Sequence, residues 1–231
     1  MHLHKIILKL FRFYHLIEMR FILLNFLIFK FCFVFGQNRF QENFWQSLLV
    51  NYTISEDYRL TLDFGHRTCD NFFNANRTSL GRVVIEKKLN ESWFIGAGYA
   101  FFEHFGKSRN PENRIFPQLI YRRVDPKFNL ETQLRFRNEI RYYHFQNKEL
   151  FNRIRFQGLV RFFQNRKFQP GLGFEYFKTL DKNGLQETRS IFQMNYDLNN
   201  SWRIQGFYIA QKQSSIDYLQ HILGFQLQLN F

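Results

Sequence analysis

The sequence predicts an all-β protein: a transmembrane antiparallel up-and-down β-barrel of about ten to twelve strands, with short periplasmic turns and longer outer loops. Three observations lead to this prediction. The chain of 231 residues is 20% aromatic and also 22% charged. Apolar and polar residues alternate with period two over most of the chain after residue 43. Short and long connections follow one another regularly between the alternating segments.

The composition excludes several other classes of protein. A disordered chain lacks aromatic residues at this level, and two cysteines are too few for a disulfide scaffold. A helical membrane protein needs several long apolar runs, and the sequence has none after residue 36. Apolar and polar residues therefore alternate over short distances, and their contributions nearly cancel in a mean hydropathy of -0.38.

The first 36 residues resemble a secretory signal peptide. An apolar run over 21–35 follows Arg20, and Val34 and Gly36 form a small-residue cleavage site. A transmembrane anchor is the alternative, but Lys30 within the run would cost about 3 kcal/mol at the centre of a bilayer.

Residues 1–18 add a basic and apolar stretch that a signal peptide does not need. We therefore expect translation to start at Met19 and 1–18 to be a spurious extension. The predicted organisation is a signal peptide over 1–36, followed by a single outer-membrane barrel domain over 37–231.

The alternating segments are rich in β-branched and aromatic residues and fit strands better than helices. The expected strands are 44–54, 58–69, 77–89, 92–104, 113–124, 128–143, 150–163, 168–178, 187–198, 201–212 and 218–231.

Between these strands, five short connections rich in turn-forming residues alternate with five longer ones. This alternation is typical of an outer-membrane barrel, whose turns are tight on the periplasmic side. The short connections are 55–57, 90–91, 125–127, 164–167 and 199–200; the longer ones are 70–76, 105–112, 144–149, 179–186 and 213–217.

The last expected strand has one apolar face and one polar but almost uncharged face. An alternating apolar strand that ends in an aromatic residue resembles the signal read by the outer-membrane barrel assembly machinery. We expect that signal to consist of Phe225, Leu227, Leu229 and Phe231. The alternative is a half-buried strand of a soluble sheet.

The strand over 128–143 carries charge on one face and mostly apolar residues on the other. If the apolar face meets lipid, the charged face must fill the lumen, because an arginine facing lipid at midplane costs about 2–4 kcal/mol. Other strands repeat this pattern, so arginines and glutamates of neighbouring strands can pair. The expected lumen charge ladder is Asp63, Arg67, Arg114, Glu131, Arg135, Arg137, Glu139, Arg141, Arg153, Arg155, Arg161, Glu175 and Arg189.

The count of expected strands is odd, whereas single-chain bacterial barrels normally have an even number. Either residues 38–43 belong to an additional strand, or one stretch is misread, and 77–89 is the least regular. With a periplasmic C-terminus, eleven strands would leave the start of the first strand outside.

Short motifs add a family resemblance. The stretch from Arg135 to Arg141 reads R-x-R-x-E-x-R, and Trp45 opens the first strand, while Asp63 and Arg67 mark the end of the second. With these motifs the chain resembles the family called "domain of unknown function 2490", predicted outer-membrane β-barrels of Gram-negative bacteria. The resemblance covers about 40–231 and implies fold and location but no chemistry. Asp63 stands where the family pattern suggests Glu.

Catalytic and metal-binding motifs are weak in this sequence. The histidines His66, His104, His144 and His221 are widely spaced, so we expect no metal site and no cofactor. The sequence contains no G-x-S-x-G motif. We expect no nucleic-acid partner either, because a lumen ladder and an export signal account for the net charge of +13.

The functional expectation is a non-enzymatic outer-membrane barrel, either structural or a narrow pore, with outer-membrane lipid and, transiently, the assembly machinery as partners. The first alternative is a lipid-modifying enzyme on the same barrel, with catalytic groups around His66, His104 or His144. The second is an exported soluble β-sandwich that binds an acidic ligand.

Overall fold

The computed structural model describes residues 41–69, 76–105, 111–144, 150–180 and 184–231. The predicted signal peptide over 1–36 and the predicted start at Met19 lie outside the described residues. The described residues contain no helical segment with the length and hydropathy of a transmembrane helix. The strands are β1 (Gln41–Thr53), β2 (Tyr58–Cys69), β3 (Asn76–Lys88), β4 (Trp93–Phe105), β5 (Glu112–Asp125), β6 (Leu130–Tyr143), β7 (Leu150–Phe162), β8 (Phe168–Thr179), β9 (Gln186–Asp197), β10 (Trp202–Gln213) and β11 (Gln220–Asn230).

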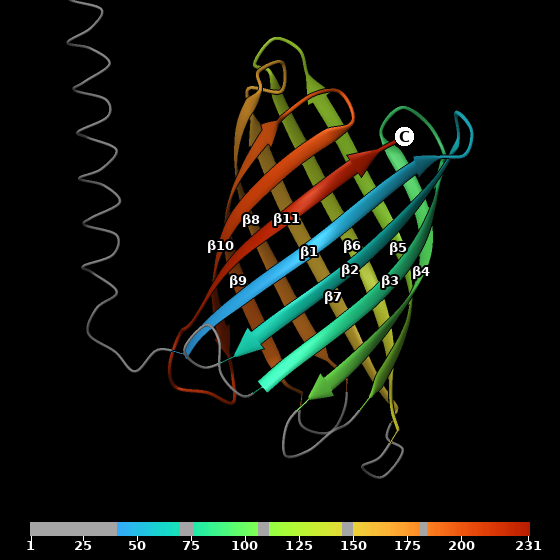
Figure 1. The fold of residues 1–231 in the computed structure, drawn as a ribbon. Helices are drawn as coiled ribbons and strands as arrows, with labels where there is room; N and C mark the ends of the chain where they lie inside the picture. The colour runs from blue at the N-terminus through green and yellow to red at the C-terminus, as the bar shows by residue number, and fades with distance from the viewer. Residues whose placement is uncertain (1–40, 70–75, 106–110, 145–149, 181–183) are drawn as a thin grey trace, which may run out of the picture. The chain divides into compact units, whose positions relative to one another are not determined.

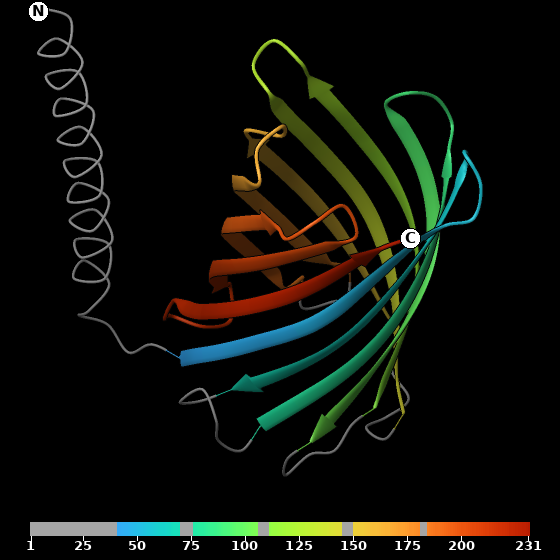
Figure 2. The same ribbon diagram turned by 45° about the horizontal axis from the view of Figure 1, so that its top comes forward.

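These strands form one closed barrel, so the predicted fold class is confirmed. Each strand pairs antiparallel with its neighbour in sequence, and β1 pairs with β11 to close the ring (Figure 1). Figure 2 shows the strands arranged around a common axis. A closed ring is not a two-sheet sandwich, so the soluble β-sandwich alternative is wrong in its architecture.

The odd strand number is real and does not come from a misread segment. The irregular stretch 77–89 forms β3, which pairs along its whole length with β2 and β4. Residues 41–43 extend β1 and do not begin an additional strand. The ring closes with eleven strands because β1 and β11 pair in parallel, from Gln41 opposite Gln220 to Asn51 opposite Asn230.

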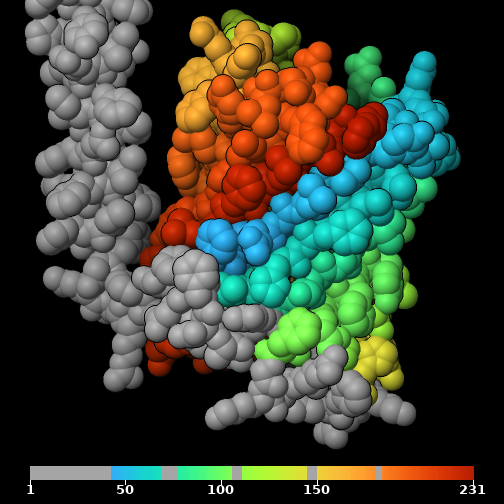
Figure 3. Space-filling view, viewed as in Figure 1, coloured from blue at the N-terminus to red at the C-terminus, as the bar shows by residue number. Residues whose placement is uncertain are grey.

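Side chains and backbone both bridge the β1–β11 seam. Asn51 Nδ2 donates to Asn230 Oδ1 at 3.0 Å, and Gln226 Nε2 donates to Ser47 Oγ at 2.9 Å. The pairing continues to Phe231, whose backbone N–H donates to the carbonyl of Asn51 at 2.9 Å. Figure 3 shows the side chains of β1, β2, β10 and β11 as a continuous outer surface across this seam.

Connections of four or five residues alternate with connections of six. Three of the short turns use the same device, in which Oδ1 of an Asn or Asp accepts backbone N–H bonds from residues two and three positions on. Asn90, Asp125 and Asn199 play this role, with distances of 2.9–3.3 Å. The short turns gather at the end of the barrel where β11 finishes, and β1 begins at the other end (Figure 1).

The distribution of polarity is the reverse of that in a water-soluble protein. Among the described residues, sixteen polar or charged side chains are buried against nine hydrophobic ones, while thirty-five large hydrophobic side chains are exposed. Alternation places most polar side chains inside and most large apolar side chains outside, although some apolar residues, such as Ala100, Phe102 and Phe116, are buried inside. The outer surface is therefore suited to hydrocarbon and the interior to water and charge.

Aromatic side chains mark both ends of the outer surface. At the short-turn end, Trp93 and Tyr121 pack with ring centroids 5.1 Å apart, and the exposed Trp202 begins β10. At the long-loop end, Tyr142 packs edge-on against His144 at 5.0 Å. Amphipathic rings at two levels are typical of interfacial girdles around a membrane barrel.

One glycine makes room for the interior. A Cβ at Gly98 in β4 would collide with the ring of Phe116 in β5 and would lie 3.0 Å from the carbonyl oxygen of Val83. Because Gly98 has no side chain, the ring of Phe116 can pack against the backbone of β4, where it is only 1% exposed.

Candidate functional site in the barrel interior

The inner face of the barrel is dense in charge and carries more arginines than carboxylates. Thirteen arginines and eight carboxylates of the described residues line the interior cavities or form ion pairs there. The arginines are Arg59, Arg67, Arg82, Arg114, Arg122, Arg135, Arg137, Arg141, Arg153, Arg155, Arg161, Arg189 and Arg203; the carboxylates are Asp63, Glu86, Glu112, Glu131, Glu139, Glu175, Glu187 and Asp197.

Glu112, at the start of β5, is fully buried and holds two arginines at the long-loop end. Its Oε1 accepts from Arg114 Nε at 2.6 Å and from Arg141 Nε at 2.5 Å, and its Oε2 accepts from Arg114 Nη2 at 2.8 Å. His104 Nε2 lies 3.6 Å from the same carboxylate. One buried acid thus contacts basic side chains from three strands, β4, β5 and β6.

Glu139 in β6 is a second shared carboxylate. It accepts from Arg153 Nη2 at 2.6 Å, and guanidinium nitrogens of Arg114, Arg137 and Arg155 lie 3.8 Å away. Only 2% of Glu139 is exposed, so these arginines meet it with little solvent between them.

Glu175 in β8 continues the network toward β9. It forms ion pairs with Arg155 and with Arg189, the latter at 3.3 Å, and it accepts from Gln157 Nε2 at 2.7 Å. Charged hydrogen bonds of this kind are stronger than neutral ones. The network therefore ties β7, β8 and β9 together from within.

The half of the interior nearer the short turns has separate pairs. Arg161 binds Glu131 at 2.5 Å and Arg122 approaches the same carboxylate at 3.6 Å. Arg59 pairs with Glu86, whose other oxygen accepts from Gln118 Nε2 at 2.9 Å.

Arginine–aromatic contacts fill the half of the lumen nearer the long loops. The guanidiniums of Arg153, Arg155 and Arg189 lie 4.6–5.0 Å from the ring centre of Phe177, and that of Arg137 lies 4.2 Å from the ring centre of Phe116. Cations are attracted to the faces of aromatic rings. We refer to Phe116, Phe177 and these four arginines as the constriction.

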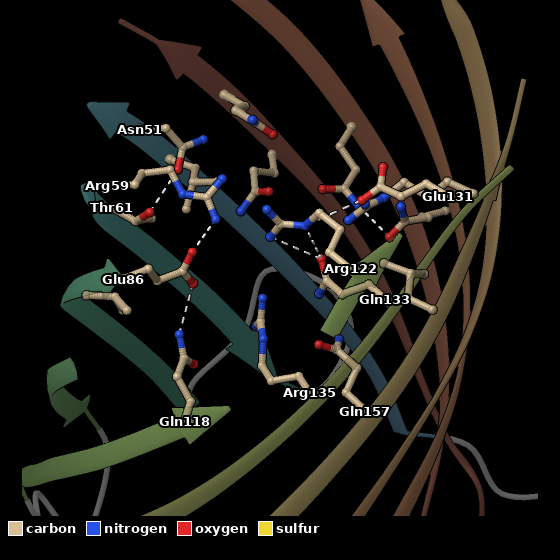
Figure 4. Close-up of a pocket in the computed structure, with 18 of the residues that line it drawn as sticks. Asn51, Arg59, Thr61, Glu86, Gln118, Arg122, Glu131, Gln133, Arg135 and Gln157 are labelled. Carbon is tan, nitrogen blue, oxygen red and sulfur yellow. Dashed lines mark hydrogen bonds and ion pairs between the residues drawn. The ribbon is translucent and has the colours of Figure 1, made fainter. Parts of the chain in front are cut away.

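Two cavities lie on the inner face and share Arg82 and Arg137. The larger, of about 450 Å³, is lined toward the short turns by seven arginines, seven glutamines and only two glutamates, Glu86 and Glu131 (Figure 4). The smaller, of about 80 Å³, includes residues of the constriction. The interior is therefore wider in the cavity near the short turns than at the constriction, where arginines line a much smaller cavity.

Two arginines have no hydrogen bond or ion pair with any described residue. Arg67 lies over the ring of Trp45 at 4.0 Å, so an aromatic face is its neighbour. Arg135 projects into the larger cavity, and Figure 4 shows its guanidinium without a dashed line to any neighbour. Every other arginine of the inner face has at least one carboxylate within 4.0 Å.

All thirteen residues of the expected charge ladder lie on this inner face. Most of them take part in ion pairs, whereas Arg67 and Arg135 form none with any described residue. Asp63 pairs with Arg82, which was not in the expected set. Glu86 and Glu112 were also missed, although both could have been found from strand parity: Glu112 stands two residues before Arg114. Phe225, Leu227 and Leu229 lie on the outer face of β11, and the exposed Phe231 follows the end of that strand. Their role in assembly stays a prediction.

The histidines occupy different surroundings. His66 is on the outer face, where Nδ1 lies 3.1 Å from Ser79 Oγ. His104 lies inside beside Glu112 and Thr78, and His144 contacts Asn113 at the rim. Across the described ranges, no three His, Cys, Asp or Glu side chains form a group that could hold a metal ion.

Fold and site together define a closed β-barrel with an apolar exterior and a charged, arginine-rich interior. The chain belongs to the family described as "Protein of unknown function (DUF2490)", whose model matches residues 42–220. The resemblance inferred from the sequence is therefore confirmed.

Comparison with individual proteins adds little. No curated protein matches the chain. Similar solved structures include "KdgM porin in complex with disordered oligogalacturonate" (13% identity, TM-score 0.46, covering 75% of this chain and 91% of that one). Another is "NanC porin structure in rhombohedral crystal form." (13%, TM-score 0.49, covering 74% and 85%). Because identity and TM-score are both low, these structures do not establish the function of this chain.

Proposed function

We propose that this chain is an outer-membrane protein of a Gram-negative bacterium, exported by a signal peptide and folded into the membrane with the help of the barrel assembly machinery. The apolar outer surface and the aromatic side chains at its two ends support this location. Long-loop connections would face the outside and short turns the periplasm.

Within that membrane, the barrel provides a narrow path for small anions. The excess of arginines over carboxylates on the inner face carries this proposal. Rings of fixed positive charge favour anions over cations in a pore. Because the constriction is tight, the path conducts weakly and excludes large solutes.

The proposal is tested by recording from purified protein in a planar bilayer under a KCl gradient. We expect small conductance steps with a reversal potential close to the chloride equilibrium potential. A cation-selective reversal potential, or a bilayer that stays silent at every salt concentration, would refute the path.

A second candidate is a lipid-modifying hydrolase on the outer face. The hydrogen bond between His66 and Ser79 favours it, because a serine activated by a histidine is the core of many acyl hydrolases. Gln46 of β1 is paired with His66, on the side opposite Ser79. It lies on the same outer face and could therefore orient the imidazole ring.

Hydrolysis of phospholipid in mixed micelles by the wild type, abolished by Ser79→Ala, would establish the hydrolase. Outer-face Ser190 on β9 supplies the matched control, Ser190→Ala. Equal release of fatty acid by wild type and Ser79→Ala would reject it.

A further inference from the structure

Hydrogen-bond donors outnumber acceptors among the buried unpaired atoms of the larger cavity. Five donor nitrogens of its lining have no acceptor among the described residues, and one acceptor, Gln157 Oε1, has no donor. The donors are Arg59 Nε, Arg82 Nε, Arg135 Nε, Arg161 Nε and Gln193 Nε2. Buried polar atoms are normally satisfied, so this wall is chemically suited to a guest that brings acceptors.

Arg135 differs from the other arginines among these donors because it forms no ion pair or hydrogen bond with any described residue, whereas Arg59, Arg82 and Arg161 each have a carboxylate partner. It stands between Ile120 of β5 and Gln157 of β7 in the register, and neither carries a charge. The next inner-face residue on the same strand, Arg137, is also a cation and repels Arg135. Nε and Nη2 of Arg137 donate to Gln118 at 3.2 and 2.7 Å.

A guanidinium presents donors in a planar fork that matches the oxygens of a carboxylate, sulfate or phosphate. A cavity of about 450 Å³ is large enough for a small organic acid or for an inorganic oxyanion with water. A cation would meet seven arginines there against two glutamates.

We infer that this cavity is a binding site for a small oxyanion, held by Arg135 and assisted by the unpaired donors of Arg82 and Gln193. The inference rests on the proposed function in one respect: solutes must reach the interior. It goes further by naming a discrete site and the chemical class of its ligand.

The test uses the folded barrel in detergent micelles and follows its thermal unfolding midpoint. Sodium sulfate, sodium acetate and sodium chloride are compared at matched ionic strength, because a ligand that binds only the folded state raises the midpoint. We expect sulfate or acetate to raise it above the value in chloride; which of the two does so identifies the preferred oxyanion.

Arg135→Gln should remove most of that additional shift. Arg166→Gln, which deletes a positive charge from an exposed turn at the same end, should keep it. Gln193→Glu provides a second variant, because it replaces an unpaired donor by a negative charge while its carboxylate can still accept from Gln205. It should also lose the shift, which keeps the test decisive if Arg135→Gln does not fold.

Equal midpoints in all three salts for the wild type, or an undiminished shift in folded Arg135→Gln or Gln193→Glu, would overturn the site. Bilayer recordings on the same preparation separate the two proposals. If oxyanions stabilise the folded barrel but no conductance is recorded, the binding site is supported and the conducting path is refuted. If the barrel conducts anions selectively but oxyanions do not stabilise it, the path is supported and the site is refuted.

Discussion

At the scale of single residues, the interior depends on a few shared carboxylates. Glu112, Glu139 and Glu175 each serve two or more arginines, and each is at most 2% exposed. Arginines outnumber acids, so each acid offsets repulsion among several cations. Replacing one acid therefore affects a group of side chains rather than one pair.

Charge reversal at Glu139 should destabilise the barrel strongly. Glu139→Arg places a fifth guanidinium among Arg114, Arg137, Arg153 and Arg155, and breaking a buried ion pair alone costs about 3–5 kcal/mol. Heat-modifiable migration on gels should report unfolding at a lower temperature than in the wild type. Glu91→Arg, on an exposed short turn, is the control. Identical behaviour of the two variants would mean that Glu139 does not face inward.

Phe177 sets the width of the constriction. Phe177→Ala removes the ring that Arg153, Arg155 and Arg189 contact, so we expect a larger single-channel conductance with anion preference retained. Outer-face Phe174→Ala on the same strand is the control, with unchanged conductance. Conductance in Phe177→Ala no greater than in this control would place the narrowest point elsewhere.

At the scale of strands, period-two alternation predicted much of the architecture. The expected strands at 113–124 and 128–143 differ by at most two residues from β5 (Glu112–Asp125) and β6 (Leu130–Tyr143). The inward direction of Arg135 and Glu139 follows from the same alternation. What the pattern could not supply is the contact across strands: that Arg82 faces Asp63 depends on the register of β2 against β3, which the alternation within one strand does not determine.

The parallel seam also has a consequence for topology. Because β1 starts at the long-loop end, an epitope inserted directly before Gln41 should bind antibody on intact cells (Figure 1). An epitope in the short turn at 54–57 should bind only after the outer membrane is permeabilised. Protection of the first epitope with exposure of the second would reverse the orientation proposed for the barrel.

At the scale of the whole molecule, closure explains why polarity can be inverted. Only a ring pairs every strand edge, and backbone polar groups left unpaired in hydrocarbon cost several kcal/mol each. Antiparallel neighbours alone cannot close eleven strands, so one parallel pair is required. Alternation delineates eleven strands, but the expectation of an even number, by an additional or a misread strand, is wrong. The parallel seam was not predicted, because pairing of the first strand with the last leaves no local signature.

Closure through β1 and β11 is tested most directly by a disulfide across the seam. In a Cys69→Ser background, Ser47→Cys with Gln226→Cys places cysteines at paired positions, within the distance that a disulfide spans. Ser47→Cys with Asn230→Cys is the control, since those positions are four residues out of register, about 13 Å along the strand. After mild oxidation of the folded barrel, we predict an intrachain disulfide in the first variant and none in the second, seen by mass spectrometry of the linked peptides. No link between positions 47 and 226, or an intrachain link only in the control, would contradict the closed eleven-stranded barrel.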